Sequence, residues 1–135
     1  MTSMCLSSAA SAAPGSGVSS TATLAEQRLA WERAVAPHGF ERVARCRACY
    51  AIRLANACKA ASELGFTYIS TTLAVSPYQL FDDCSAILER TARACGLVPV
   101  TRDWRPLYPQ ATRESRERGM YRQNYCGCRF SAAEA

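Results

Sequence analysis

Four cysteines stand in two short motifs whose spacing suits redox or metal chemistry. Cys46 and Cys49 form a C-x-x-C motif in "RCRACYAIRL", and Cys126 and Cys128 form a C-x-C motif in "YRQNYCGCRF". The chain has 8 cysteines and no recognisable export signal. Because cytosolic thiols are kept reduced, clustered thiols in such a chain favour metal binding or redox cycling over a framework of structural disulfides.

The C-x-C motif is too short for an ordinary structural disulfide. Two residues of extended chain span at most about 7 Å, so the Cα atoms of Cys126 and Cys128 already lie near the range of a disulfide. The ring would be strained, and Gly127 allows the backbone to bend into it. Strained, accessible disulfides are easily reduced. The motif therefore predicts a pair that cycles between dithiol and disulfide; the alternative is a structural zinc ion held by all four cysteines.

The C-x-x-C motif is expected in the first turn of a helix, where the helix dipole would lower the pKa of both thiols. Three further cysteines are expected in the core. Cys58 lies about 180° around the same helix from Cys49, on its apolar stripe, and Cys84 and Cys95 share the apolar face of the next helix. A free cysteine packs there as a small hydrophobic residue.

The elements that must position these thiols alternate between helix and strand. Apolar spacing predicts helices over 24–35, over 46–64 before Gly65, and from the Ser76-Pro77 start to residue 95 before Gly96. The segments "FTYISTTLAV" and "LVPVT" are typical of strands. This order predicts an α/β fold, a partial Rossmann-like (HUP-like) parallel sheet with crossover helices. Two strands make a poor sheet, so we expect an N-terminal unit to be missing or another chain to complete it.

Composition divides the chain into a tail and a domain. Residues 1–23 are rich in Ser and Ala and predict a disordered tail, in which Cys5 has no assigned role. Residues 24–135 form the expected domain. No apolar run approaches the roughly 18 residues of a membrane span, so we expect a cytoplasmic protein without a membrane partner. The net charge of +5 suits a polyanionic partner.

Three stretches, "RCRACYAIRL", "STTLAVSP" and "YRQNYCGCRFS", resemble the QueH-type epoxyqueuosine reductases, the cobalamin-independent enzymes of queuosine synthesis. The similarity runs from about Arg45 to Ser131. It implies reduction of epoxyqueuosine to queuosine in tRNA, with Cys46 and Cys49 as ligands of a 4Fe-4S cluster and Cys126 and Cys128 as the redox-active pair. A second iron has been associated with the family, but its ligands cannot be matched to residues of this chain.

The chain departs from the family pattern on its N-terminal side. Family members open with a strand that ends in adjacent cysteines, which form the other half of the cluster site. Here a Ser/Ala-rich stretch with the solitary Cys5 stands in that place. Cys46 and Cys49 supply two thiolates, whereas such a cluster normally takes four. The resemblance therefore leaves open whether this chain alone holds the cluster and is active, and which electron donor it uses.

Substrate contacts are predicted beside the thiols and at the end of the first strand. Residues that flank the C-x-C motif match the family pattern, and open α/β sheets place their sites at the ends of strands. The alternatives are tyrosines that pack at the edge of the core, threonines that pack on the sheet, and a serine that caps a helix. The predicted substrate-binding residues are Tyr121, Arg122, Gln123, Tyr125, Thr71, Thr72 and Ser76.

The C-terminal third is rich in arginine and aromatic residues, which can pair with phosphates and stack on an extruded base. Asp103 is a further candidate, as an acid-base group or metal ligand, because it follows the second predicted strand. The rival class is a non-enzymatic zinc- or RNA-binding module with a four-cysteine site. Besides Arg122, the arginines of the C-terminal third that could pair with phosphates are Arg102, Arg105, Arg113, Arg116, Arg118 and Arg129.

Overall fold

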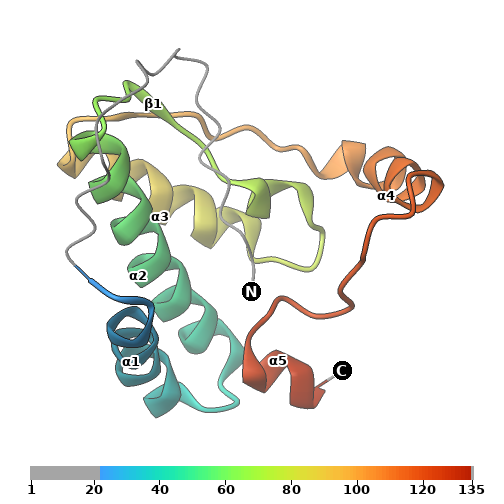
Figure 1. The fold of residues 1–135 in the computed structure, drawn as a ribbon, viewed down its shortest axis with the longest axis horizontal. Helices are drawn as coiled ribbons and strands as arrows, with labels where there is room; N and C mark the ends of the chain where they lie inside the picture. The colour runs from blue at the N-terminus through green and yellow to red at the C-terminus, as the bar shows by residue number, and fades with distance from the viewer. Residues whose placement is uncertain (1–21, 135) are drawn as a thin grey trace.

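The computed structural model describes residues 22–134, and it shows a mostly helical chain with one small parallel sheet (Figure 1). The predicted tail lies outside the described residues except for its last two positions. In chain order the elements are α1 (Leu24–Val35), a 3-10 turn (Ala36–His38), α2 (Arg42–Glu63), β1 (Tyr68–Ile69), a 3-10 turn (Thr72–Val75), α3 (Phe81–Ala94), β2 (Val98–Pro99), a 3-10 turn (Arg105–Leu107), α4 (Tyr108–Glu117) and α5 (Arg129–Glu134).

Helix α1 has the expected bounds, and α3 ends where it was predicted to end. Helix α1 begins with a capping box: Thr23 Oγ1 accepts from the Glu26 amide at 3.2 Å, and the Glu26 carboxylate accepts from the Thr23 amide at 2.7 Å. This exchange satisfies two amides that a helix start otherwise leaves open. Helix α3 ends at Ala94, and Gly96 follows with a φ of 72°.

Helix α2 begins earlier than predicted, at Arg42 rather than near Cys46. Nothing in "ERVAR" disfavours a helix, and the chain turns instead at Gly39, whose φ of 51° is a conformation that glycine adopts without strain. Cys46 and Cys49 therefore lie beyond the first turn. The prediction that both thiols lie in the first turn, where the helix dipole would lower their pKa values, is therefore wrong.

The predicted parallel pair is present, but its strands are shorter than predicted. Tyr68 pairs with Val98 and Ile69 with Pro99. Pro99 has no amide to extend the ladder. After β1, Thr71 Oγ1 accepts from the Leu73 amide at 3.2 Å and the chain enters a 3-10 turn. The described residues therefore form a two-stranded parallel sheet and not a larger one.

The predicted helix start at Ser76 is also wrong, because α3 begins at Phe81. Ser76 Oγ instead accepts from the Tyr78 amide at 3.2 Å. This bond closes a local turn that serine side chains commonly form, and it competes with helix initiation. The segment between the 3-10 turn and α3 is thus a loop.

The main core lies between α2, α3 and the sheet. Cys58 and Cys84 are buried in it, and Cys95 packs against it half-buried, so the three cysteines predicted to pack do so. No helix among residues 22–134 combines the length and apolar character needed to cross a bilayer. The buried residues of this core are Tyr50, Leu54, Cys58, Ala61, Ile69, Leu73, Cys84, Ile87, Leu88, Ala92 and Leu97.

Helices α1 and α5 lie at the start of α2, whereas α4 stands apart on the other side of the molecule (Figure 1). An extended stretch of chain after α4 leads back to α5. This return brings the C-x-C motif from the far side of the molecule to α2.

We predict that Leu54→Ala lowers the free energy of unfolding by about 2–5 kcal/mol, because it leaves a cavity in the main core. Leu54 is 1% exposed, whereas Leu29 on α1 is 56% exposed. Leu29→Ala is the matched control and should change the free energy of unfolding by no more than about 0.5 kcal/mol. Urea unfolding followed by circular dichroism measures both, and equal effects would contradict the placement of α2.

Candidate functional site

All four motif cysteines line one cavity, which we call the cysteine cavity. Its interior is small, with about 30 Å³ of room for water-sized molecules, within about 430 Å³ of empty space that includes open solvent. Its walls come from the end of α1, the first half of α2, the loop before α3 and the C-x-C motif. The sequence motifs that stand far apart in the chain are thus brought together. The lining residues are Val35, Arg45, Cys46, Cys49, Tyr50, Arg53, Leu73, Gln79, Cys126 and Cys128.

The two motifs present their sulfur atoms differently. Cys46 and Cys49 are three residues apart on α2, which places them on one face of the helix, and both thiols are free and half-buried. Cys126 is half-buried and Cys128 is 6% exposed. Gly127 between them has a φ of 94°, which an L side chain rarely adopts. The bend predicted for this glycine is therefore present.

A second apolar cluster holds the C-x-C motif against α1 and α2. Its buried members are Val35, Cys128 and Phe130, and Trp31 and Cys49 pack against them. Ser131 Oγ also accepts from the Cys126 amide at 3.2 Å, and the Ser131 amide donates to Cys128 Sγ at 3.5 Å. The position of both thiols thus depends on how α5 docks.

Two ion pairs fix α5 in place. Arg45 is 2% exposed and donates from both terminal nitrogens to Glu134 at 2.8 and 2.9 Å, and from Nη1 to the Gly39 carbonyl at 3.2 Å. Its guanidinium also lies 5.6 Å from the Phe130 ring centroid. Arg129 forms a second bidentate pair with Glu32 of α1, at 3.0 Å for each contact. The buried Arg45 Nε has no partner among the described residues.

Burial dominates the electrostatics of the cavity. Burial raises the pKa of the Cys46 thiol, partly offset by the charge of Arg45, and raises the pKa of the Cys49 thiol, partly offset by a hydrogen bond from Trp31. Both thiols also interact with the sulfur of Cys126. The expected lowering of these pKa values is therefore wrong, because desolvation disfavours the thiolate more than the positive groups favour it.

Three contributors to this site, Tyr50, Trp31 and Arg45, were missed in the sequence. Tyr50 is 3% exposed, donates to Gln79 Oε1 at 2.8 Å and accepts from the Leu80 amide at 3.0 Å, and burial raises its pKa. Trp31 and Arg45 contact the cavity cysteines or the segment that carries them. One signal was available for Arg45: it lies four residues before Cys49, so a helix that began at Arg42 would place both on one face.

The residues before the C-x-C motif lie on its solvent side. Tyr121 is 87% exposed, Arg122 is exposed and Tyr125 is 37% exposed. Gln123 Nε2 donates to the Tyr125 carbonyl at 3.2 Å. None of the four is among the described residues that line the cysteine cavity. Their substrate-binding role stays a prediction.

The three substrate-binding candidates predicted at the end of the first strand lie outside the lining of the cavity. Thr71 is buried and caps the 3-10 turn, Thr72 is exposed, and Ser76 closes a turn. In the described part of the chain, Leu73 and Gln79 of the same region line the cavity and these three residues do not. Their substrate role also stays a prediction.

Asp103 is held by Arg105. Its carboxylate accepts from Arg105 Nε at 2.8 Å, from Nη2 at 2.7 Å and from the Arg105 amide at 3.0 Å. These contacts lower the pKa of Asp103. A carboxylate that stays ionised is a poor proton donor, so the arrangement disfavours an acid role near neutral pH.

The donor set of the cavity fits a metal cluster in part. Two free thiols on one face of α2 could ligate two corners of an iron-sulfur cluster, which normally takes four thiolates. Among residues 22–134, however, no three His, Cys, Asp or Glu side chains are grouped so as to hold a metal ion. A four-cysteine zinc site would therefore need the C-x-C motif to move.

Comparison with known proteins decides the family. The profile of the epoxyqueuosine reductase QueH family matches residues 9–134. The chain belongs to the QueH family. The resemblance predicted from the motifs is thus confirmed, and the match extends further towards the N-terminus than the motifs did.

Relatives in three bacteria bear the name epoxyqueuosine reductase QueH. The protein of Dehalococcoides mccartyi is 33% identical over 90 residues, which are 67% of this chain and 50% of that protein. The Thermotoga maritima protein is 34% identical over 92 residues, or 67% and 48%. The Streptococcus pyogenes protein is 32% identical over 91 residues, or 65% and 35%. The chain thus spans about half the length of the first two relatives.

We predict that Glu134→Gln loosens α5 and makes its docking insensitive to acid. Arg45 lowers the pKa of Glu134 below its ordinary value of 4.5. The pair therefore stabilises docking fully above that value, and its contribution is lost as the pH falls through the lower, folded value. Amide hydrogen exchange in residues 126–134 should be several-fold faster in the variant at pH 7.

Glu89→Gln is the matched control, because Glu89 forms an exposed pair with Arg93 at 3.1 Å far from α5. It should leave exchange in residues 126–134 unchanged. Two results would contradict the stabilising role of the pair between Arg45 and Glu134. One is wild-type exchange that does not become faster in residues 126–134 in acid, and the other is a Glu134→Gln variant as protected as the wild type.

Proposed function

We propose that this chain takes part in the reduction of epoxyqueuosine to queuosine in tRNA, with Cys126 and Cys128 as the source of two electrons. One observation carries the proposal. The C-x-C and C-x-x-C motifs, from opposite ends of the domain, line one cavity. Membership of the QueH family supplies the reaction class. Because the chain spans about half the length of its relatives, the activity is proposed for it and not transferred from them.

The reaction balances with these two thiols. Two thiols give up two electrons and two protons and become one disulfide. The epoxide loses its oxygen, which leaves as water, and its two ring carbons become an alkene. A reductant of the dithiol class must then reopen the disulfide before the next turnover.

The two thiols are suited to different parts of this step. Cys126 is half-buried and Cys128 is 6% exposed, so Cys126 is the sulfur that a substrate in the cavity can reach. Cys128 sits in the apolar cluster with Val35 and Phe130, where it can close the disulfide without meeting solvent. The bend at Gly127 allows the two sulfur atoms to approach.

Cys46 and Cys49 are proposed as two ligands of a 4Fe-4S cluster at the same cavity. When bound, such a cluster supplies electron relay or Lewis acidity. Among the described residues, Cys46 and Cys49 are not joined by further side chains that would complete the usual set of four ligands. The remaining ligands, a second iron and the electron donor are therefore not assigned to residues of this chain.

Substrate holding is proposed for the exposed residues before the C-x-C motif. Arg122 can pair with a phosphate, and Tyr121 and Tyr125 can stack on an extruded base. Arg105 and Arg129 are already paired with Asp103 and Glu32, so they are poorer candidates for phosphate contacts than Arg122.

We predict that Cys126→Ser and Cys128→Ser each abolish single-turnover conversion of epoxyqueuosine in tRNA, because no disulfide can then form. In the wild type, mass spectrometry after one turnover should find one Cys126–Cys128 disulfide for each queuosine formed. Cys95→Ser is the matched control, since Cys95 is half-buried in the main core away from the cavity. Full activity of the doubly substituted protein would overturn the proposal.

We further predict that anaerobically purified protein contains iron and sulfide, and that Cys46→Ser with Cys49→Ser removes both, because these thiols are the proposed ligands. Metal and acid-labile sulfide analysis measures this directly. A colourless protein that carries zinc would instead favour the non-enzymatic four-cysteine module. Loss of metal in the Cys95→Ser control would contradict the assignment of the ligands.

A further inference from the structure

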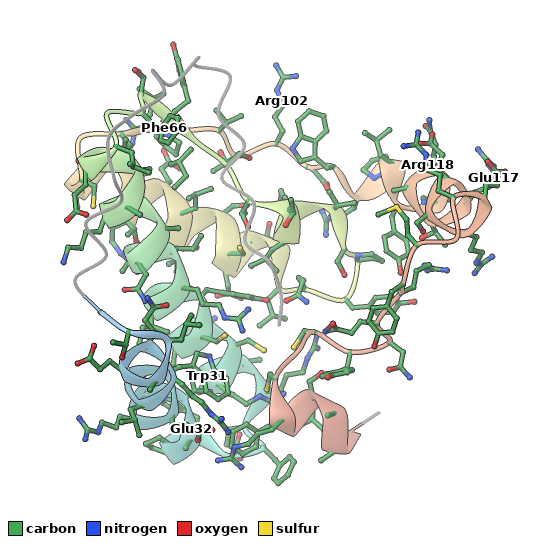
Figure 2. The ribbon with its side chains drawn as sticks, in the orientation of Figure 1. Trp31, Glu32, Phe66, Arg102, Glu117 and Arg118 are labelled. Carbon is green, nitrogen blue, oxygen red and sulfur yellow. The ribbon has the colours of Figure 1, made fainter. Side chains whose placement is uncertain are left out.

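Trp31 makes a specific polar contact with one cavity cysteine. Its indole Nε1–H donates to Cys49 Sγ at 3.2 Å. An indole has a single donor and no acceptor, so this bond uses its whole hydrogen-bonding capacity. Figure 2 shows Trp31 where α1 meets α2, at the end of the molecule that carries α5.

The surroundings hold the indole in this position. Trp31 packs half-buried against the cluster of Val35, Cys128 and Phe130. The neighbouring Glu32 is tied to Arg129 of α5. The ring is thus fixed from two sides, and its donor is aimed at a sulfur although a neutral thiol is only a weak acceptor.

We propose that Trp31 is a positioning residue for Cys49: its N–H fixes the orientation of the sulfur and takes up negative charge when that sulfur binds a metal as a thiolate. The inference rests on the proposed function of Cys49 as a ligand. Hydrogen bonds to ligating sulfurs hold the ligand in place and tune the metal centre. A thiolate accepts such a bond more strongly than a thiol does, because one partner is charged.

The two proposed ligands, Cys49 and Cys46, therefore interact with different neighbouring side chains. Cys49 receives a directed hydrogen bond from α1, whereas Cys46 has the positive charge of the neighbouring Arg45. This difference predicts that removing the indole N–H affects one sulfur and not the other.

The contact itself can be tested without metal. The chain has 2 tryptophans, Trp31 and Trp104, so Trp104→Phe leaves Trp31 as the single tryptophan, which can be excited selectively at wavelengths that tyrosine does not absorb. Thiols quench indole emission on contact. Adding Cys49→Ala to this background should raise Trp31 fluorescence, whereas adding Cys58→Ala should not. Equal emission with and without Cys49 would overturn the contact.

The positioning role is tested with Co²⁺ as the probe metal. Trp31→Phe keeps an aromatic ring but removes the N–H. It should weaken Co²⁺ binding at least about tenfold, as loss of such a supporting bond typically does, and move the sulfur-to-cobalt charge-transfer band to lower energy. Trp104→Phe is the matched control and should change neither. A purely structural ring would leave the band in place.

The outcomes separate the two proposals. Unchanged Co²⁺ affinity and spectrum in Trp31→Phe, with the wild type binding normally and losing Co²⁺ on Cys49→Ser, would overturn only the role of Trp31. A wild-type protein that binds neither Co²⁺ nor iron and sulfide would overturn the metal site itself. Should Trp31→Phe fail to fold, the fluorescence comparison in the Trp104→Phe background still decides whether Trp31 contacts Cys49.

Discussion

The packing of Cys128 and Phe130 against Val35 is the interaction on which the site depends. It docks α5 on α1 and α2 and carries the C-x-C motif back from the far side of the molecule (Figure 1). The pair between Arg45 and Glu134 reinforces it. Without this docking, the four sulfur atoms would belong to two separate surfaces and no shared cavity would exist.

The buried Arg45 side chain stabilises this arrangement through several contacts. A buried guanidinium is costly unless its charge and its donors are satisfied. Glu134 and the Gly39 carbonyl satisfy the two terminal nitrogens, and Phe130 lies beneath the group, whereas the buried Nε has no partner among the described residues. The same burial disfavours thiolates at Cys46 and Cys49. A bound metal, which requires thiolates, would have to overcome this cost.

The sequence predicted what local patterns and motifs encode. Helix α1, the end of α3, the parallel pairing of the two strands, the buried Cys58 and Cys84 and the family all agree with the structure or the comparisons. The early start of α2 and the short strands were missed, because capping by Thr71 and the turn at Gly39 override the propensity of longer segments. The pair of Arg45 with Glu134 joins distant parts of the chain, and no local pattern reveals it.

The central claim is that the two cysteine motifs share one cavity, and a short dithiol-bridging reagent tests it directly. Applied to the reduced, metal-free protein and followed by tryptic digestion, it should join the peptide of residues 48–53, which carries Cys49, to the peptide of residues 123–129, which carries Cys126 and Cys128. The account predicts this link in the wild type. Bridging confined to Cys126 and Cys128, with Cys49 never joined to either, would contradict it.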